Sequence, residues 1–440
     1  WLKPFWLQIR FCLALKSLIP SAEQGPLIMA ATSNSFPAAT AVRKRSPSPK
    51  TKVVREGPDP DGLLEYSVVY TNRSLNHMSL KFQQVMRDVS SIFKHVYAGH
   101  SVALIPGSGT FAMESVARQF GTAQKCIVLR NGYFSYRWSQ ILEMGSIPTE
   151  EIVLKGRPVE DVANPYYAPC PLHEVVEAIH QHRPGVVFAP HVETSSGIIL
   201  PDEYMKGVAD AVHAVGGIFV LDCIASGCIW VDMAATGIDV LISAPQKGWS
   251  ASPSVGIVML SKNGRDRLES TKATAFALDL KKWVAVMEAY EQGGHMYHTT
   301  MPTDSIIRLR DVQRESQAYG FERLRKEQFE QGDLIRRLLM RKGYKSVAAP
   351  GFGAPGVVVS YTSDPEMKTG KKFAALGMQI AAGVPLMLDE FTTTSPDFRT
   401  FRLGLFGIDK LKKMKATVTK LEQALDALGG LTAKPMASRL

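Results

Sequence analysis

The stretch that decides the fold contains two apolar runs, Gly217-Ile218-Phe219-Val220-Leu221-Asp222 and Val240-Leu241-Ile242-Ser243. The second run leads into Ala244-Pro245-Gln246-Lys247-Gly248-Trp249. Apolar runs without alternating polar residues are typical of parallel strands that are covered on both faces. Asp222 and Lys247 are 25 positions apart, which corresponds to one strand–helix–strand step. Because ligands of such sheets bind beyond the carboxyl ends of the strands, this spacing allows both side chains to reach one crevice.

The same alternation of short apolar runs and amphipathic segments extends in both directions from this stretch. We expect further strands at Ser101–Ile105, Lys125–Arg130, Gly185–Pro190 and Val255–Leu260. Helical patterns lie between the strands, at Thr110–Phe120, Leu172–Gln181 and Asp202–Val215. The pattern predicts an α/β fold with a largely parallel sheet.

The pattern changes after Arg308, and we expect a smaller α+β domain there. Its predicted elements are a long helical stretch, two short strands and a final helix, at Leu309–Lys342, Gly356–Tyr361, Phe401–Leu405 and Asp409–Leu428. The expected organisation is a leader at residues 1–55, a large domain at 56–310, a small domain at 311–430 and a tail at 431–440.

The composition narrows the classes of partner. The net charge is +10, but residues 1–55 hold nine bases and one acid, which leaves the rest of the chain at +2. Because residues 56–440 are nearly neutral, their charge does not indicate nucleic-acid binding. The five cysteines include no Cys-x-x-Cys pair, so neither a disulfide framework nor a metal site is indicated. No apolar run is long enough to span a bilayer, and we therefore expect a soluble protein without a membrane partner.

Both ends of the chain contain targeting patterns. Residues 1–55 are basic and poor in acids, which fits an organelle transit peptide, although Met29 as the true start is the simpler interpretation. The final Ser438-Arg439-Leu440 is a close variant of the Ser-Lys-Leu peroxisomal signal. We therefore expect a peroxisomal location, with the mitochondrion or the cytoplasm as alternatives.

Three segments around the predicted sheet have residue types suited to catalysis. Pro106-Gly107-Ser108-Gly109-Thr110 closes a strand and opens a helix, so its backbone N–H groups suit a phosphate, although most such turns are only turns. Asp222, taken alone, reads as a helix cap. Lys247, taken alone, reads as a solvated loop residue, but small and apolar neighbours would lower its pKa and make it a nucleophile.

Two further segments complete the set. His191-Val192-Glu193-Thr194-Ser195-Ser196-Gly197 follows a predicted strand, and Phe401-Arg402-Leu403-Gly404 lies in the predicted small domain. An arginine can bind a carboxylate through two hydrogen bonds, although an isolated arginine in a strand usually pairs with a surface acid.

In this order and spacing, the five segments resemble the class V, fold-type I aminotransferases that use pyridoxal phosphate (PLP). The likeness runs from about residue 100 to 410 and is closest to alanine–glyoxylate and serine–glyoxylate aminotransferases. Tyr297-His298-Thr299-Thr300 adds to it. The resemblance implies a mainly parallel sheet of the seven-stranded type, an obligate homodimer with shared active sites, and transamination between alanine or serine and glyoxylate or pyruvate.

The resemblance also implies a role for each matching residue. Lys247 forms the internal aldimine and shuttles the α-proton, and Asp222 binds the pyridine nitrogen. Phe134 stacks on the ring, Ser195 lies near its phenolic oxygen, and Arg402 binds the substrate carboxylate. The implied phosphate ligands are Ser108, Gly109, Thr110 and Gln246, with Tyr297 and Thr300 of the partner subunit.

The sequence departs from this family at two places that we expect to line the substrate pocket. One is Tyr70–Ser79, which includes Arg73, and the other is Trp249 with the Ser250–Ser254 run. A 2-aminoethylphosphonate transaminase and a PLP-dependent lyase therefore remain as alternatives. A desulfurase is disfavoured because no cysteine follows Cys228. A degenerate, non-enzymatic binding protein of this fold would have lost Lys247 or Asp222, and both are present.

Overall fold

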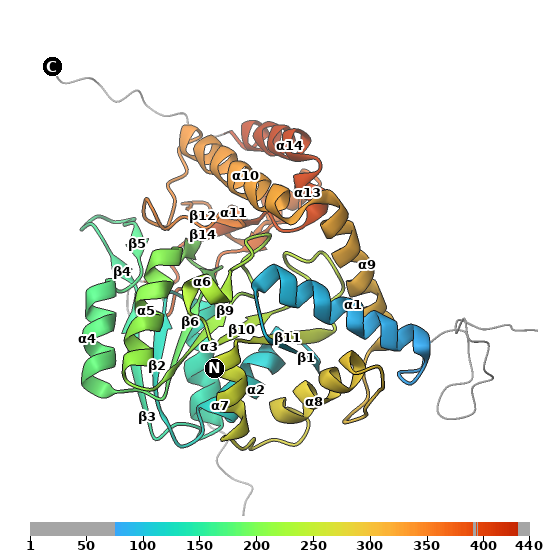
Figure 1. Ribbon diagram of the computed structural model, residues 1–440. Coiled ribbons are helices and arrows are strands. Elements are labelled where there is room, and N and C mark those ends of the chain that lie inside the picture. Colours follow the sequence, from blue (N-terminus) through green and yellow to red (C-terminus); the bar gives the residue numbers. More distant parts are fainter. Residues whose placement is uncertain (1–74, 390–392, 394, 430–440) are drawn as a thin grey trace, which may run out of the picture. The chain divides into compact units, whose positions relative to one another are not determined.

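The computed structural model describes residues 75–389, 393 and 395–429 (Figure 1). The predicted leader, Arg73 and the terminal tripeptide lie outside these residues. Helices and strands alternate along most of the described chain. In its first half the helices are α1 Leu80–Tyr97, α2 Gly109–Phe120, α3 Tyr133–Met144, α4 Leu172–His182, α5 Asp202–Ala214, α6 Met233–Thr236, α7 Lys262–Glu269 and α8 Leu280–Glu291.

A seven-stranded sheet forms the centre of this part of the chain, in the order β1-β11-β10-β9-β6-β2-β3. The four neighbouring pairs from β10 to β3 are parallel, and β11 runs antiparallel to both β10 and β1. The strands are β1 Ser101–Pro106, β2 Lys125–Arg130, β3 Glu150–Lys155, β6 Val186–Pro190, β9 Ile218–Asp222, β10 Val240–Ser243 and β11 Val255–Leu260. The prediction of an α/β fold with a mainly parallel sheet is confirmed.

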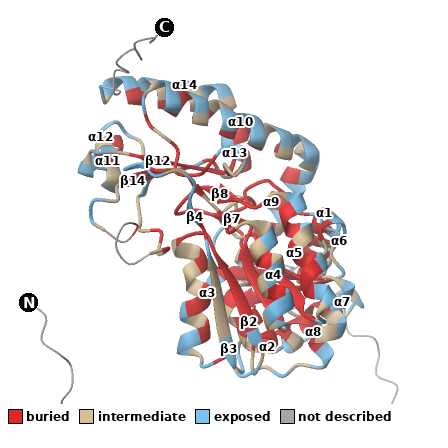
Figure 2. Ribbon diagram, turned by 90° about the vertical axis from the view of Figure 1, so that its left-hand side faces the viewer, coloured by how far each residue is buried: buried red, intermediate tan, exposed pale blue. Residues whose placement is uncertain are grey.

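Burial of the strands explains why they could be recognised in the sequence. Every residue of β6, β9, β10 and β11 is buried, so side chains on both sides of these strands are covered. Figure 2 shows the neighbouring strand β2 in the colour of buried residues. β3 lies at the edge of the sheet, and its two ends are exposed. The sequence analysis did not predict β3, because the strand begins with two acidic residues and is not a continuous apolar run.

The later elements surround a second, three-stranded antiparallel sheet in the order β12-β14-β13. An apolar cluster joins it to α10 and α14, through side chains such as Leu338, Phe401 and Leu425. The elements here are α9 Thr303–Tyr319, α10 Phe321–Arg341, β12 Val357–Tyr361, α11 Pro365–Thr369, α12 Lys371–Ala375, β13 Ala381–Ala382, β14 Thr400–Gly404, α13 Ile408–Leu411 and α14 Met414–Ala427. Two-residue pairs complete the list, β4 Arg157–Pro158 with β5 Tyr167–Ala168 and β7 Val192–Glu193 with β8 Ile198–Ile199.

Two predicted helices are each split in the structure. The stretch expected at Leu309–Lys342 is two helices, α9 and α10, because Gly320 adopts φ +102° between them. The helix expected at Asp409–Leu428 is divided into α13 and α14. Within the described ranges no helix is both long enough and apolar enough to cross a bilayer.

Candidate active site

Asp222 is the last residue of β9, and its carboxylate is buried without a direct ion pair among the described residues. The carboxylate accepts a hydrogen bond of 2.9 Å from the backbone N–H of Ile224. Burial, with a smaller contribution from the charge of Glu193, raises the pKa of Asp222 to about 7. The Ile224 hydrogen bond and the charge of Arg137 oppose this rise. No ion pair within 4.0 Å involves Asp222 among the residues that the structure describes. A buried carboxylate of this kind is suited to a ligand that carries a positively charged N–H group.

Lys247 lies in the loop between β10 and β11, and its side chain is partly buried. Its Nζ atom is 5.2 Å from the centre of the Phe406 ring. Burial lowers the pKa of Lys247, and the positive charge of Arg402 lowers it further. A lower pKa increases the fraction of neutral amine, which is the form that attacks carbonyl carbons.

The N-terminus of α2 is packed closely against the strands that bear these two residues. The side chain of the N-cap residue Ser108 makes no hydrogen bond to the helix. A Cβ atom at Gly109 would lie 2.5 Å from Ile224 Cδ1 and 3.3 Å from Ala244 Cβ, so only glycine fits there. The first turn of α2 therefore lies beside Asp222 and lacks a side-chain cap, which suits an anion such as phosphate.

The N-terminus of α3, in contrast, is capped by a carboxylate from the chain itself. Glu193 is fully buried and accepts hydrogen bonds from the backbone N–H groups of Phe134 (3.2 Å), Ser135 (2.8 Å) and Ser195 (3.0 Å). The Ser195 hydroxyl lies 2.8 Å from Glu193 Oε1 and accepts from the backbone N–H of Tyr133 at 2.9 Å. These contacts fix the first turn of α3 and hence the backbone that carries Phe134.

Arg402 extends from β14 toward the same region. Its Nε donates to the carbonyl oxygen of Ala382 at 2.7 Å, and a terminal nitrogen lies 3.5 Å from the oxygens of Thr194. Its Cζ atom is 5.6 Å from the centre of the Phe134 ring. In the described part of the chain no carboxylate forms an ion pair with Arg402 within 4.0 Å. Its guanidinium group is therefore available to a carboxylate from outside the chain.

The structure thus brings most of the predicted residues into one connected group, and four predicted residues are exposed, one of which is Thr110 in that group. Gln246 is exposed beside Lys247. Tyr297 and Thr300 are exposed, with their hydroxyl oxygens 3.5 Å apart, and the Tyr297 ring contacts His77. Their assignment to the site of a partner subunit stays a prediction.

One residue expected in the substrate pocket lies elsewhere. Trp249 is 1% exposed and packs against the rings of Trp230 and Phe93, at 4.5 and 5.1 Å. Its Nε1 donates to the hydroxyl of Tyr97 at 3.1 Å. The expectation that Trp249 lines the pocket is wrong, because its large apolar ring is part of the core behind the lysine loop.

Sequence reasoning missed three residues of this group, Glu193, Phe406 and Arg137. Two features of the sequence could have pointed to Glu193. It is an acid two positions before Ser195, and the helix that begins after Asn131-Gly132 has no capping acid of its own. Phe406 follows Arg402 by four positions in a segment expected to be a strand end. No local pattern in the sequence marked Arg137.

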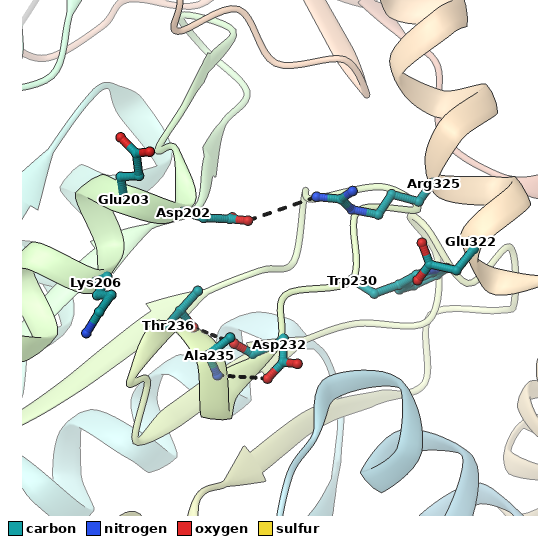
Figure 3. Close-up of a pocket in the computed structure, with 9 residues that line it drawn as sticks. All are labelled: Asp202, Glu203, Lys206, Trp230, Asp232, Ala235, Thr236, Glu322 and Arg325. Atoms are coloured by element: carbon teal, nitrogen blue, oxygen red, sulfur yellow. Dashed lines mark hydrogen bonds and ion pairs between the residues drawn. The ribbon is translucent and has the colours of Figure 1, made fainter.

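A separate hollow of about 310 Å³ opens at the starts of α5 and α10, and none of the predicted site residues lines it (Figure 3). Asp202 points toward Arg325, with 4.0 Å between their charged groups. Asp232 caps α6 by accepting from the backbone N–H of Ala235 at 2.9 Å. Both of these carboxylates therefore have partners within the chain.

Comparison with known proteins gives relatives for this fold and site. Alanine–glyoxylate aminotransferase of Felis catus is 28% identical over 265 residues, which cover 58% of this chain and 60% of that protein. The solved structure of the alanine–glyoxylate aminotransferase from Nostoc sp. matches with a TM-score of 0.66 and 21% identity, over 80% of this chain and 89% of that one. The chain has the fold of the class V aminotransferases.

A further relative with a similar level of identity is matched over a longer stretch. The 2-aminoethylphosphonate–pyruvate transaminase 2 of Paraburkholderia xenovorans is 26% identical over 348 residues, or 77% of this chain and 87% of that protein. The chain spans only about 60% of the length of the alanine–glyoxylate aminotransferases that it matches. No family model matches the chain.

Aminotransferases of this fold use pyridoxal phosphate, and the residues of this chain fit that group. The buried Asp222 has the charge to hold a protonated ring nitrogen, and the uncapped start of α2 suits a phosphate. Lys247 supplies an amine of lowered pKa for an aldehyde. The expectation of the fold and of its cofactor is confirmed, whereas the role of each residue is a matter for experiment.

Proposed function

We propose that this chain is a PLP-dependent aminotransferase that moves an amino group between alanine or serine and glyoxylate or pyruvate. The observation that carries the proposal is the presence of a partly buried lysine amine, Lys247, and a buried carboxylate without a direct ion pair, Asp222, after neighbouring parallel strands of one sheet. The alanine–glyoxylate aminotransferases similar to this chain support the choice of substrates.

In this proposal the chain positions the cofactor through groups that are already fixed. Asp222 holds the ring nitrogen in its protonated form, Phe134 covers a face of the ring, and Ser108–Thr110 bind the phosphate. When bound, pyridoxal phosphate supplies an aldehyde that reacts with amines and a ring that withdraws electrons from the bonds of the attached carbon.

Lys247 and Arg402 act on the substrate. Arg402 binds the substrate carboxylate and thereby orients the bond between Cα and its hydrogen. With substrate bound, the Nζ atom of Lys247 would accept the proton from Cα and deliver it to the carbon that had been the cofactor aldehyde, and the reverse transfer would serve the second substrate. Its lowered pKa keeps enough of this amine neutral to act as the base.

The proposal is tested by replacing Lys247. We expect Lys247→Ala to lose both turnover and the visible absorbance band of a cofactor bonded to the protein, because no other amine takes its place. A matched control is Lys262→Ala, which removes an exposed lysine that pairs with Asp266 at 2.6 Å. In the unmodified chain, alanine or serine should shift the band and glyoxylate should restore it. Turnover that survives Lys247→Ala would contradict the assignment.

A second candidate is an aminoethylphosphonate-type transaminase. The observation that favours it is the sequence match to the Paraburkholderia transaminase, which covers 77% of this chain, against 58% for the sequence match to the alanine–glyoxylate aminotransferase of Felis catus. The same spectral assay with 2-aminoethylphosphonate as donor and pyruvate as acceptor distinguishes the two. A response to the phosphonate without a response to alanine or serine would select this candidate.

Two further expectations belong to this proposal. A homodimer with shared sites would cover the exposed rings of Tyr297 and Phe276, which are 61% and 78% exposed. Sedimentation equilibrium of the full chain tests the dimer. A peroxisomal location rests on Ser438-Arg439-Leu440 and is tested by imaging an N-terminal fluorescent fusion with and without these three residues.

A further inference from the structure

Arg137 lies on the first turns of α3, between the start of α2 and the aromatic ring of Phe134. Its guanidinium group donates to the hydroxyl oxygen of Thr110, the second residue of α2, at 3.3 Å. The Cζ atom of Arg137 is 5.0 Å from the centre of the Phe134 ring. Arg137 therefore contacts two of the residues to which the proposed function assigns the phosphate and the ring of the cofactor.

The charge of Arg137 is within electrostatic reach of Asp222, whose pKa it lowers, but no carboxylate of the described residues is in direct contact with it. Among the described residues no ion pair within 4.0 Å includes it. A cation beside a helix N-terminus is unfavourable, because the free N–H groups there already present partial positive charge. The contact with the face of the Phe134 ring offsets only part of this cost. An anion between Arg137 and the start of α2 would be attracted by both.

The two neighbouring helix starts differ in a way that supports such an anion. The start of α3 receives the buried carboxylate of Glu193, which satisfies its backbone N–H groups from within the chain. The start of α2 has no side-chain cap, because the side chain of its N-cap residue, Ser108, makes no hydrogen bond to the backbone N–H groups of the helix. The chain thus supplies an anion for one helix and leaves a cation beside the other.

We propose that Arg137 binds the phosphate of the cofactor, together with the first turn of α2. This inference rests on the proposed function, since it assumes pyridoxal phosphate as the ligand. A second anionic group on the substrate is the competing partner for Arg137. The phosphate is favoured because the hydrogen bond of Arg137 goes to Thr110, on the helix start, whereas the proposed function already assigns the substrate carboxylate to Arg402, which has no ion pair within 4.0 Å among the described residues.

The test compares two ligands that differ only in the phosphate. The full-length chain, freed of any cofactor that copurifies, is titrated with pyridoxal 5′-phosphate and with pyridoxal, and binding is followed by absorbance. The variants are Arg137→Met and Arg137→Lys. The control is Arg118→Met, which removes the same charge from the far end of α2, where Arg118 pairs with Glu114 at 2.8 Å.

We expect Arg137→Met to weaken the binding of pyridoxal 5′-phosphate by about 10- to 100-fold, as for the loss of one charge-assisted hydrogen bond. The affinity for pyridoxal should stay within about twofold, which also shows that the variant is folded. Arg137→Lys should restore part of the loss, and Arg118→Met should change neither affinity.

The outcomes separate the inference from the proposed function. If Arg137→Met retains the preference for the phosphorylated ligand, or weakens both ligands equally, Arg137 does not bind the phosphate. The second result would assign it to the ring through Phe134. If the unmodified chain binds neither ligand, the proposed function fails, and this inference fails with it.

Discussion

Glu193 offers the most direct test of how this site is held together. Its carboxylate is fully buried and receives three backbone N–H groups, from Phe134, Ser135 and Ser195, at 2.8–3.2 Å. Removing one partner of a buried charged interaction costs about 3–5 kcal/mol. We expect Glu193→Ala to lower the free energy of unfolding by that amount, because these three backbone donors and the hydroxyls of Ser135 and Ser195 lose their acceptor.

A conservative substitution at the same position refines the prediction. Glu193→Gln keeps the shape of the side chain but turns one acceptor group into a donor that faces other donors. One or two hydrogen bonds are lost rather than all of them, so the expected decrease in the free energy of unfolding is about 1–3 kcal/mol. The looser start of α3 should also reduce the affinity for pyridoxal 5′-phosphate, since Phe134 is no longer fixed.

The assay is urea unfolding of the cofactor-free protein at one protein concentration, followed by circular dichroism. The control is Glu143→Gln on the same helix, because Glu143 is exposed and should cost less than about 0.5 kcal/mol. A free energy of unfolding for Glu193→Ala within about 1 kcal/mol of the unmodified chain would refute the capping role.

Two further variants test the sheet edge. The unfolded chain loses the Asp222 proton near the ordinary pKa of 3.8, but the folded chain keeps it up to about 7, so raising the pH through this window destabilises the cofactor-free protein. Asp222→Asn should therefore be more stable relative to the unmodified chain at pH 8 than at pH 5, by about 2–3 kcal/mol, in thermal melts at both pH values, because about two pKa units of the window lie above pH 5; equal differences would oppose the burial argument. Gly248→Ala places a Cβ atom 2.0 Å from the Gly227 carbonyl oxygen and should lower the free energy of unfolding by about 1–3 kcal/mol or more, whereas Gly294→Ala, with its nearest atom at 3.4 Å, should be tolerated. A normal urea midpoint for Gly248→Ala would show that the lysine loop can move aside.

The sequence predicted the central strands well because strands buried on both faces consist of continuous apolar runs. Lys125–Arg130, Val240–Ser243 and Val255–Leu260 have the predicted bounds, since each is an unbroken apolar run between polar residues. The edge strand β3 was missed, since half of its surface faces solvent and its composition is mixed. Helical periodicity could not reveal the break at Gly320, because a single glycine is tolerated within many helices.

The positions of site residues could be predicted where they follow from the order of the strands that carry these residues. Asp222 and Lys247 follow neighbouring strands, so strand order alone placed them at one edge of the sheet. Contacts between distant segments could not be read from the chain. Glu193 and Phe134 are 59 residues apart, and Arg137 and Thr110 are 27 apart. Trp249 was misplaced for a related reason, since the direction of a side chain within a loop has no periodic signal.

The single antiparallel strand of the large sheet has a consequence for protein engineering. Because β11 returns directly beside β10, the loop with Lys247 enters and leaves the sheet at one edge, with Ser243 opposite Ile257. Hydrogen bonds tie it further, from Gly107 to Ser254 and from Ile408 to Ser250. The lysine is thus preorganised, so that little chain entropy remains to be lost when a ligand bonds to it. Insertions or grafted sequences in this loop would disturb both ties at once. Redesign of substrate range is better directed at the strand that carries Arg402.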